Sequence, residues 1–173
     1  MTLSRPFLIL AATIPVLAGC QFSFSTGGPD YEKLETAITD ELNTQYESIS
    51  RQVTAVECPR PDETPKVGDT ITCVADLDGN DVRVDTTFTS DDYDVNFETI
   101  DTVYELGDTA DGLAQDISGE YGFDVTVDCG QGIKVVPVGD TFECSAADRS
   151  GDTRPVVITA GGPDENDHWE VVE

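Results

Sequence analysis

The feature that most constrains the fold is a string that occurs twice, Val-Gly-Asp-Thr followed by two residues and a cysteine. The copies end at Cys73 and Cys144. Each is preceded by another cysteine, Cys58 or Cys129, at the same distance of 15 positions, and the two pairs lie 71 positions apart. This doubly matched spacing predicts a tandem duplication of a unit of about 70 residues.

The first 20 residues have the features of a bacterial export signal. Arg5 is the only charge, an apolar run extends over residues 7–17, and a Leu-Ala-Gly-Cys string that ends at Cys20 resembles the lipobox of bacterial lipoproteins. In that family the cysteine receives a diacylglyceryl group and becomes the N-terminus after cleavage. We therefore predict a signal peptide at residues 1–19 and an anchor on Cys20, where two or more acyl chains such as palmitate hold the chain on the extracytoplasmic face of the cell membrane. The alternative is an ordinary secreted protein in which Cys20 has no role.

The remaining four cysteines fit a disulfide framework. Lipidation of Cys20 leaves an even number, which in an exported chain indicates disulfides. Four cysteines allow three pairings, and the duplicated spacing favours Cys58 with Cys73 and Cys129 with Cys144, because each unit can then fold by itself. The alternatives are a metal site or a redox dithiol, and both fit poorly because the chain has no Cys-x-x-Cys motif and only one histidine.

The hydrophobic pattern of the first unit, residues 30–100, predicts one helix followed by antiparallel strands. It follows a Ser- and Gly-containing tether at residues 20–29. Asp30 is a candidate N-cap, and the apolar residues behind it recur at helical spacing. They are Leu34, Ile38, Leu42, Tyr46 and Ile49. Strands with alternating apolar residues are expected near residues 70–77, 82–89 and 93–98, with a hairpin turn at residues 78–80.

The second unit, residues 101–173, repeats this pattern with a weaker helix signal. We expect a capping box at residues 102–105, followed by an apolar helical stripe. The stripe consists of Leu106, Ala110, Leu113, Ile117 and Tyr121. Gly107, Gly112 and Gly119 predict a less stable helix. Trp169 falls where Phe97 falls in the first unit. The predicted fold class is α+β, with one helix packed on a small antiparallel sheet and one disulfide in each of two tandem repeats.

Taken together, these features resemble a known family. The lipobox, the tether, the helix, the paired cysteines and the Val-Gly-Asp-Thr string are similar to the domain of unknown function 4333, which occurs singly or in tandem in small envelope lipoproteins of actinobacteria. The resemblance covers about residues 31–98 and 102–173. It implies a compact α+β unit pinned by a disulfide, and it implies no known activity or cofactor. The glycine-containing second helix and the strong acidity depart from the family pattern.

The charge of the chain argues against nucleic acid as a partner. Lys and Arg number 9 against 35 Asp and Glu, and the formal net charge is −26. Such a field repels phosphate backbones. The acidity is typical of a solvated surface or of adaptation to salt, and it also attracts cations and basic partners.

The sequence predicts neither a catalytic residue nor a metal or cofactor site. His168 is the single histidine, and no Gly-x-Ser-x-Gly turn or Gly-rich phosphate loop is present. The segment that begins at Asp76 lacks the glycine and the glutamate that a calcium loop requires at its sixth and twelfth positions. A weaker candidate for loose cation binding is the acidic loop at residues 161–167.

The leading functional hypothesis is a non-enzymatic interaction module on a membrane anchor. Its expected partner is an envelope protein or a cell-wall component. The alternatives are a cation-dependent binding protein that uses the acidic loops and a hydrolase built on carboxylates. The sequence does not predict the oligomeric state.

Overall fold

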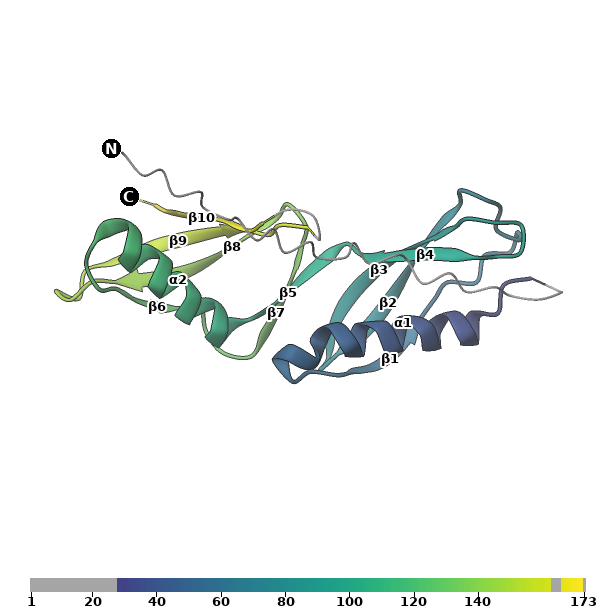
Figure 1. Ribbon diagram of the computed structural model, residues 1–173, viewed down its shortest axis with the longest axis horizontal. Helices are drawn as coiled ribbons and strands as arrows, with labels where there is room; N and C mark the ends of the chain where they lie inside the picture. The colour runs from purple at the N-terminus through teal and green to yellow at the C-terminus, as the bar shows by residue number, and fades with distance from the viewer. Residues whose placement is uncertain (1–27, 163–165, 173) are drawn as a thin grey trace, which may run out of the picture.

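The computed structural model describes residues 28–162 and 166–172. These residues form a mixed structure of helices and antiparallel sheets, elongated along one axis (Figure 1). The first half, residues 30–100, contains α1 (Tyr31–Tyr46), the 3-10 turn η1 (Glu47–Ile49), β1 (Val53–Glu57), β2 (Thr70–Leu77), β3 (Asn80–Phe88) and β4 (Val95–Thr99). The second half, from residue 101 onward, contains β5 (Asp101–Glu105), α2 (Leu106–Tyr121), β6 (Thr126–Asp128), β7 (Ile133–Pro137), β8 (Thr141–Ala147), β9 (Thr153–Thr159) and β10 (His168–Val171).

The first helix begins and packs as its sequence predicts. The Asp30 side chain accepts a hydrogen bond from the backbone N–H of Lys33 at 3.2 Å, which satisfies one of the free donors of the first turn. The residues Leu34, Ala37, Ile38, Leu42 and Tyr46 are buried on one face. The helix ends at Tyr46, before the predicted last member of the stripe, because the chain tightens into η1 and then adopts a left-handed conformation at Ser50.

The first sheet has the strand order β1-β2-β3-β4, and all its neighbours are antiparallel. A two-residue turn at Asp78 and Gly79 joins β2 to β3, as the sequence predicts. The apolar positions of the two strands lie directly opposite one another, since Cys73 pairs with Val84 and Ala75 with Val82. This register places the alternating apolar residues on one face against α1, where they form a buried core.

The second sheet has the order β6-β8-β9-β10, also antiparallel throughout. Cys144 lies opposite Val156, as Cys73 lies opposite Val84 in the first sheet. The predicted match between Trp169 and Phe97 is confirmed by the pairing, because Trp169 lies opposite Ile158 and Phe97 lies opposite Thr86. The two sheets therefore share their strand order and the position of the cysteine in the second strand.

Two predictions for the second half are wrong. Residues 101–105 form β5 instead of a capping box, and the N-cap of α2 is Glu105, whose carboxylate accepts from the backbone N–H of Asp108 at 2.9 Å. Strand β5 pairs with β7 in a separate two-stranded sheet. Tyr121 does not belong to the buried stripe either, because 52% of its surface is exposed, whereas the other four predicted members of the stripe are buried.

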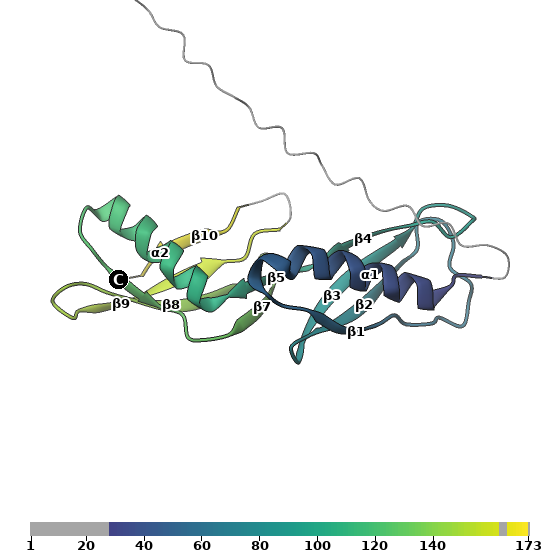
Figure 2. The same cartoon turned by 60° about the horizontal axis from the view of Figure 1, so that its bottom comes forward.

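Both helices run in the same direction along the molecule, from right to left in Figure 1. The C-terminal end of α1 points toward the second half, and β5 and β7 lie between the two larger sheets. The C-terminal end of α2 lies near the left end of the molecule in Figure 1, and Figure 2 shows it on the same side as β10. The two ends of the elongated body are therefore built from different elements.

Candidate functional site

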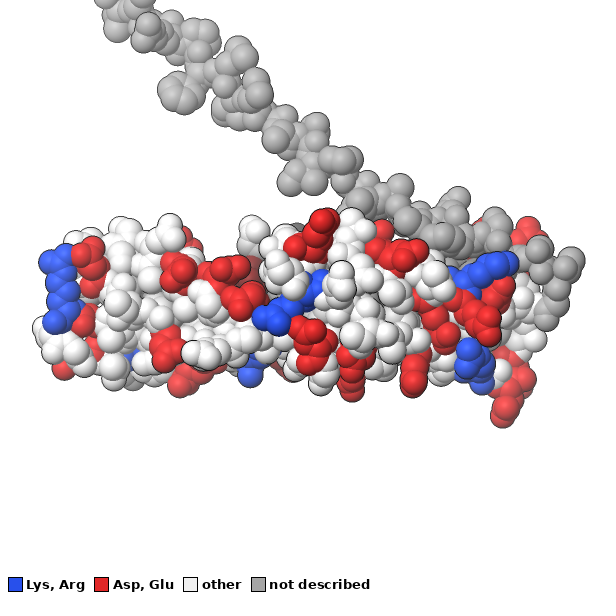
Figure 3. Space-filling model, turned by 90° about the horizontal axis from the view of Figure 1, so that it is seen from below, with Lys and Arg blue, Asp and Glu red and all other residues white. Residues whose placement is uncertain are grey.

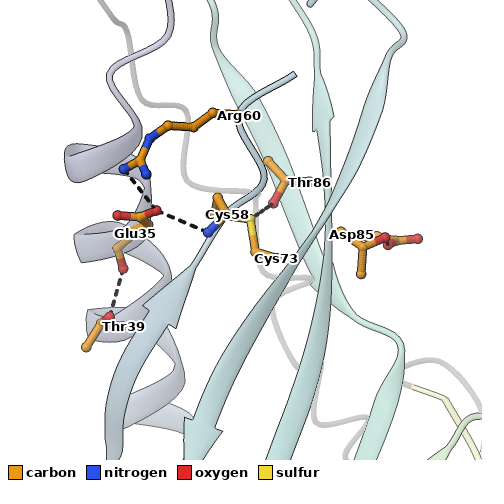
Figure 4. Close-up of a disulfide and its surroundings, with 8 residues drawn as sticks. Glu35, Thr39, Cys58, Arg60, Cys73, Asp85 and Thr86 are labelled. Atoms are coloured by element: carbon orange, nitrogen blue, oxygen red, sulfur yellow. Dashed lines mark hydrogen bonds and ion pairs between the residues drawn. A yellow bond between two sulfur atoms is a disulfide. The ribbon is translucent and has the colours of Figure 1, made fainter. Parts of the chain in front are cut away.

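The first predicted disulfide is confirmed and is deeply buried. Cys58 and Cys73 are bonded with their Cα atoms 4.2 Å apart, and their residues are 6% and 0% exposed. The Sγ atom of Cys73 lies 3.7 Å from the hydroxyl of Thr86 (Figure 4). Because water and other thiols have little access to either sulfur, this geometry is typical of a structural bridge and unlike that of a redox dithiol.

A carboxylate from α1 holds the chain beside this disulfide. Glu35 accepts a hydrogen bond from the backbone N–H of Cys58 at 3.1 Å and lies 3.5 Å from the guanidinium of Arg60 (Figure 4). The same guanidinium lies 5.5 Å from the centre of the Tyr31 ring. Glu35 thus connects the helix to the segment that follows β1, and no local sequence pattern predicts this contact.

The second predicted disulfide, between Cys129 and Cys144, is also confirmed, with a Cα separation of 4.4 Å. Cys144 is 3% exposed and Cys129 is half-buried. The backbone N–H of Gly130 donates to the carboxylate of Asp128 at 2.8 Å, which tightens the turn after the first cysteine. This bridge lies nearer to solvent than the first one.

The string that occurs twice in the sequence has a structural role in both halves. Gly68 and Gly139 adopt φ values of +92° and +86°, a region that favours glycine. Each of these glycines donates its N–H to the end of the third strand of its sheet, to the carbonyl of Phe88 or of Ala160, at 2.8 Å. The following aspartate accepts with its backbone carbonyl from the same residue of that strand. The string therefore fixes the start of the strand that carries the second cysteine.

The side chain of the valine that opens each string is exposed in both halves. Val67 is 53% exposed and Val138 is 41% exposed, so both copies place an apolar side chain on the surface. Isolated apolar side chains are common on protein surfaces and do not by themselves indicate a binding site.

The most strongly built polar cluster lies at the junction of the two halves. Asp101, which is 5% exposed, accepts from the backbone N–H of Arg83 at 2.7 Å and from its Nε and Nη2 atoms at 3.0 and 2.6 Å. Hydrogen bonding to this carboxylate raises the pKa of the Arg83 guanidinium above its ordinary value. Only Ile100 separates β4 from β5, and its N–H donates to the carbonyl of Arg83. The strand thus passes from one half into the other without a linker.

A second arginine links the halves at the same junction. Arg51 contacts Asp78 of the first half at 2.8 Å and lies 3.9 Å from Glu105, the residue that caps α2. Nearby, Tyr46 is 9% exposed; burial, and to a lesser extent the charge of Asp101, raise its pKa to about 12. The junction is therefore held by two arginines of the first half and two carboxylates of the second.

Apolar packing accompanies these contacts. Val103 of β5 and Ile133 and Val135 of β7 pack against the core of the first half. The two-stranded sheet thus covers one end of the first core and separates it from the second. Among the described residues, this apolar packing and the contacts of the two arginines connect the halves into one continuous body. Sequence analysis did not predict which residues make these contacts.

The remaining predicted site residues fall into two groups. Cys20, the signal peptide, most of the tether and residues 163–165 of the acidic loop lie outside the described residues. His168 is exposed at the start of β10, and Asp167 accepts from the hydroxyl of Tyr104 at 2.7 Å and from the backbone N–H of Gly161 at 2.8 Å. Burial, and after it this hydrogen bond to Asp167, raise the pKa of Tyr104 above its usual range. Asp167 therefore has a structural role at the end of the loop.

Within residues 28–162 and 166–172, no group of three or more His, Cys, Asp or Glu side chains is arranged to hold a metal ion. No helix in this part of the chain is long and apolar enough to cross a membrane. Acidic side chains are spread along the face shown in Figure 3, and basic side chains occupy only a few separate places on it. The geometry defines an acidic α+β protein with two disulfides and an ordered junction.

Comparison with known proteins adds one match. Residues 15–92 match the model of a domain of unknown function, DUF4333. The matched segment includes Cys20 and the first disulfide, and the second disulfide lies beyond it. No curated protein matches the chain. No solved structure matches it either.

Proposed function

We propose that this chain is a lipoprotein of the cell envelope, anchored through Cys20 on the extracytoplasmic face of the cell membrane, and that its folded part is a non-enzymatic interaction module. The observation that carries the proposal is the cysteine arrangement. All four cysteines after the lipobox are paired in disulfides, which are characteristic of exported proteins, and Cys20 is the one that remains. The segment that matches DUF4333 also includes this cysteine.

We further propose that the folded part consists of two tandem DUF4333-like repeats, as in the actinobacterial lipoproteins that the family resemblance suggests. The shared strand order of the two larger sheets, the equivalent disulfides and the two identical turns support this reading. In the second copy the helix starts later relative to the cysteines, because β5 occupies the positions that correspond to the start of α1.

The interaction role is supported by what the described residues offer. Acyl transfer needs a nucleophile beside a base, and the single histidine is exposed on an edge strand. What the described part of the molecule offers instead is an acidic and elongated surface, which suits contact with an envelope protein or a wall component. A negative net charge of this size disfavours nucleic acid.

The anchor is tested by expressing the full chain and the Cys20→Ser variant in a bacterium that processes lipoproteins. We expect the full chain to fractionate with membranes and its N-terminal peptide to carry the mass of a diacylglyceryl group. The variant should lose both properties. A Cys129→Ser variant, which keeps the lipobox, is the control and should still be lipidated. Full-length chain in the soluble fraction with an unmodified Cys20 would refute the proposed anchor.

A further inference from the structure

The C-terminal ends of the two helices have the same residue in opposite environments. Each helix ends in a tyrosine, Tyr46 in α1 and Tyr121 in α2. Tyr46 is 9% exposed at the junction, whereas Tyr121 is 52% exposed at the far end of the molecule. The last residue of the helix is therefore buried in the first half, where the two halves meet, and exposed to solvent in the second half.

Two exposed aromatic side chains lie at this end, and one of them, Tyr121, lines a groove. Its ring lies 6.2 Å from that of Phe123, which is 48% exposed. A groove runs between the end of α2 and β10, and it is lined by Glu120, Tyr121, Asp167, His168, Trp169, Glu170 and Val171. Trp169 is half-buried at the base of β10. Large aromatic side chains that remain this accessible are typical of docking surfaces.

Strand β10 forms the edge of its sheet on this side. The order β10-β9-β8-β6 leaves one side of β10 without a paired strand among the described residues. The free backbone groups of such an edge can accept an added strand, and the neighbouring pockets then select its side chains. The groove thus has both backbone groups that fit an extended segment and aromatic side chains that fit an apolar residue.

Charge decides what kind of segment fits. Glu120 and Glu170 line the groove and are exposed, and among the described residues no Lys or Arg lines it. At the corresponding end of the first half, the first and last residues of β5 contact two arginines. Arg83 binds the carboxylate of Asp101, and Arg51 lies near the carboxylate of Glu105. In the second half, Pro155 occupies the position that corresponds to Arg83. The backbone shows this equivalence, because the N–H of Val172 donates to the carbonyl of Pro155 as the N–H of Ile100 donates to that of Arg83. A segment like β5, with its acidic residues Asp101 and Glu105, would bring negative charges to a groove that is already acidic. The charges therefore favour a basic segment.

We propose that this groove binds an extended, basic segment of a partner protein, which adds as a strand to β10 and places an apolar side chain against the exposed ring of Tyr121. The proposal rests on the interaction role given above and names the surface and the chemistry of the partner. It does not depend on how the chain is anchored.

The test uses the full chain and the fluorescence of Trp169, the single tryptophan in the sequence. The probes are three ten-residue peptides: alternating Lys and Val, alternating Glu and Val, and alternating Lys and Ser. We expect saturable binding of the Lys-Val peptide with a shift in Trp169 emission, and at least tenfold weaker binding of the other two. Equal binding of the Glu-Val peptide would overturn the basic partner, and equal binding of the Lys-Ser peptide would overturn the apolar contact.

Two variants locate the site. A Tyr121→Ser, Phe123→Ser double variant should weaken Lys-Val binding at least tenfold. The control, Val67→Ser, removes an equally exposed apolar residue from the first half and should change nothing. The groove would be refuted if only the control variant lost binding, or if both variants bound the peptide as well as the unchanged chain does. Concentration-dependent self-association that the double variant abolishes would also overturn the proposal, in favour of a second copy. If the chain from a bacterium that processes lipoproteins has an unmodified Cys20 and still binds the Lys-Val peptide, the proposed anchor is refuted and the proposed groove is not.

Discussion

The two halves share the strand order of their larger sheets but differ in how completely their cores exclude water. Of the largest side chains in the described part of the chain that are almost fully shielded, only Val156 belongs to the second half, while Leu34, Ile38, Phe88 and others belong to the first. The second helix also carries glycines at exposed positions where α1 has larger residues. A smaller shielded core stabilises less, so the second half depends more on its disulfide and on the junction than the first half does.

Removal of the disulfides should give the largest effect. In the chain-entropy model a bridge across a loop of this length contributes about 3 kcal/mol. We expect a Cys129→Ser, Cys144→Ser variant to lose amide protection throughout the second sheet while the first sheet stays protected. The matched variant, Cys58→Ser with Cys73→Ser, should keep its first sheet folded at low denaturant. Hydrogen exchange read residue by residue distinguishes the two, and equal loss of protection in both would contradict the comparison.

Weakening the junction should have an intermediate effect. Asp101→Asn replaces a nearly buried carboxylate that accepts charge-assisted hydrogen bonds from Arg83, so the free energy of unfolding should fall by about 2 kcal/mol. Urea unfolding measures this change. Glu98→Gln, which removes one exposed charge from the adjacent strand, is the control and should change the free energy by less than about 0.5 kcal/mol. An equal fall in both variants would show that net charge, and not the junction, is responsible.

Filling a helix glycine should have the smallest effect and the opposite sign. Nothing lies within 4 Å of where a Cβ would stand at Gly112, so Gly112→Ala should stabilise the second half by about 1 kcal/mol. Gly122→Ala is the matched control, because Gly122 adopts a φ of +75° at the end of the same helix and alanine there is strained. Thermal unfolding should therefore shift upward for the first variant and downward for the second. A downward shift for Gly112→Ala would mean that this glycine serves the fold in another way.

Much of the fold could be predicted because its signals are local or repeated. The helical stripe that begins at Leu34, the alternation around Cys73 and the two-residue turn at Asp78 each require only a few neighbouring residues. The disulfide pairing followed from equal spacing. In each case the physical cause lies within one short segment, so the sequence pattern contains it.

The junction could not be predicted in the same way. Asp101 is one of 35 acidic residues, and nothing in the neighbouring sequence marks it as the one that is buried. The duplicated spacing also misled the prediction for residues 101–105, because it aligned them with the start of α1. The β-branched residues Val103, Ile133 and Val135 were the available signal, since alternation in both segments is typical of paired strands.

The shared direction of the two helices gives the molecule a polarity. The chain enters the folded body beside Asp30, at the right end in Figure 1, and the groove beside Tyr121 lies at the opposite end. Between β4 and β5 the chain passes from one half to the other through Ile100 alone. Whatever holds the segment before Asp30 therefore carries the groove at the distant end of the body, and a pull on that end crosses between the halves along the backbone from β4 to β5.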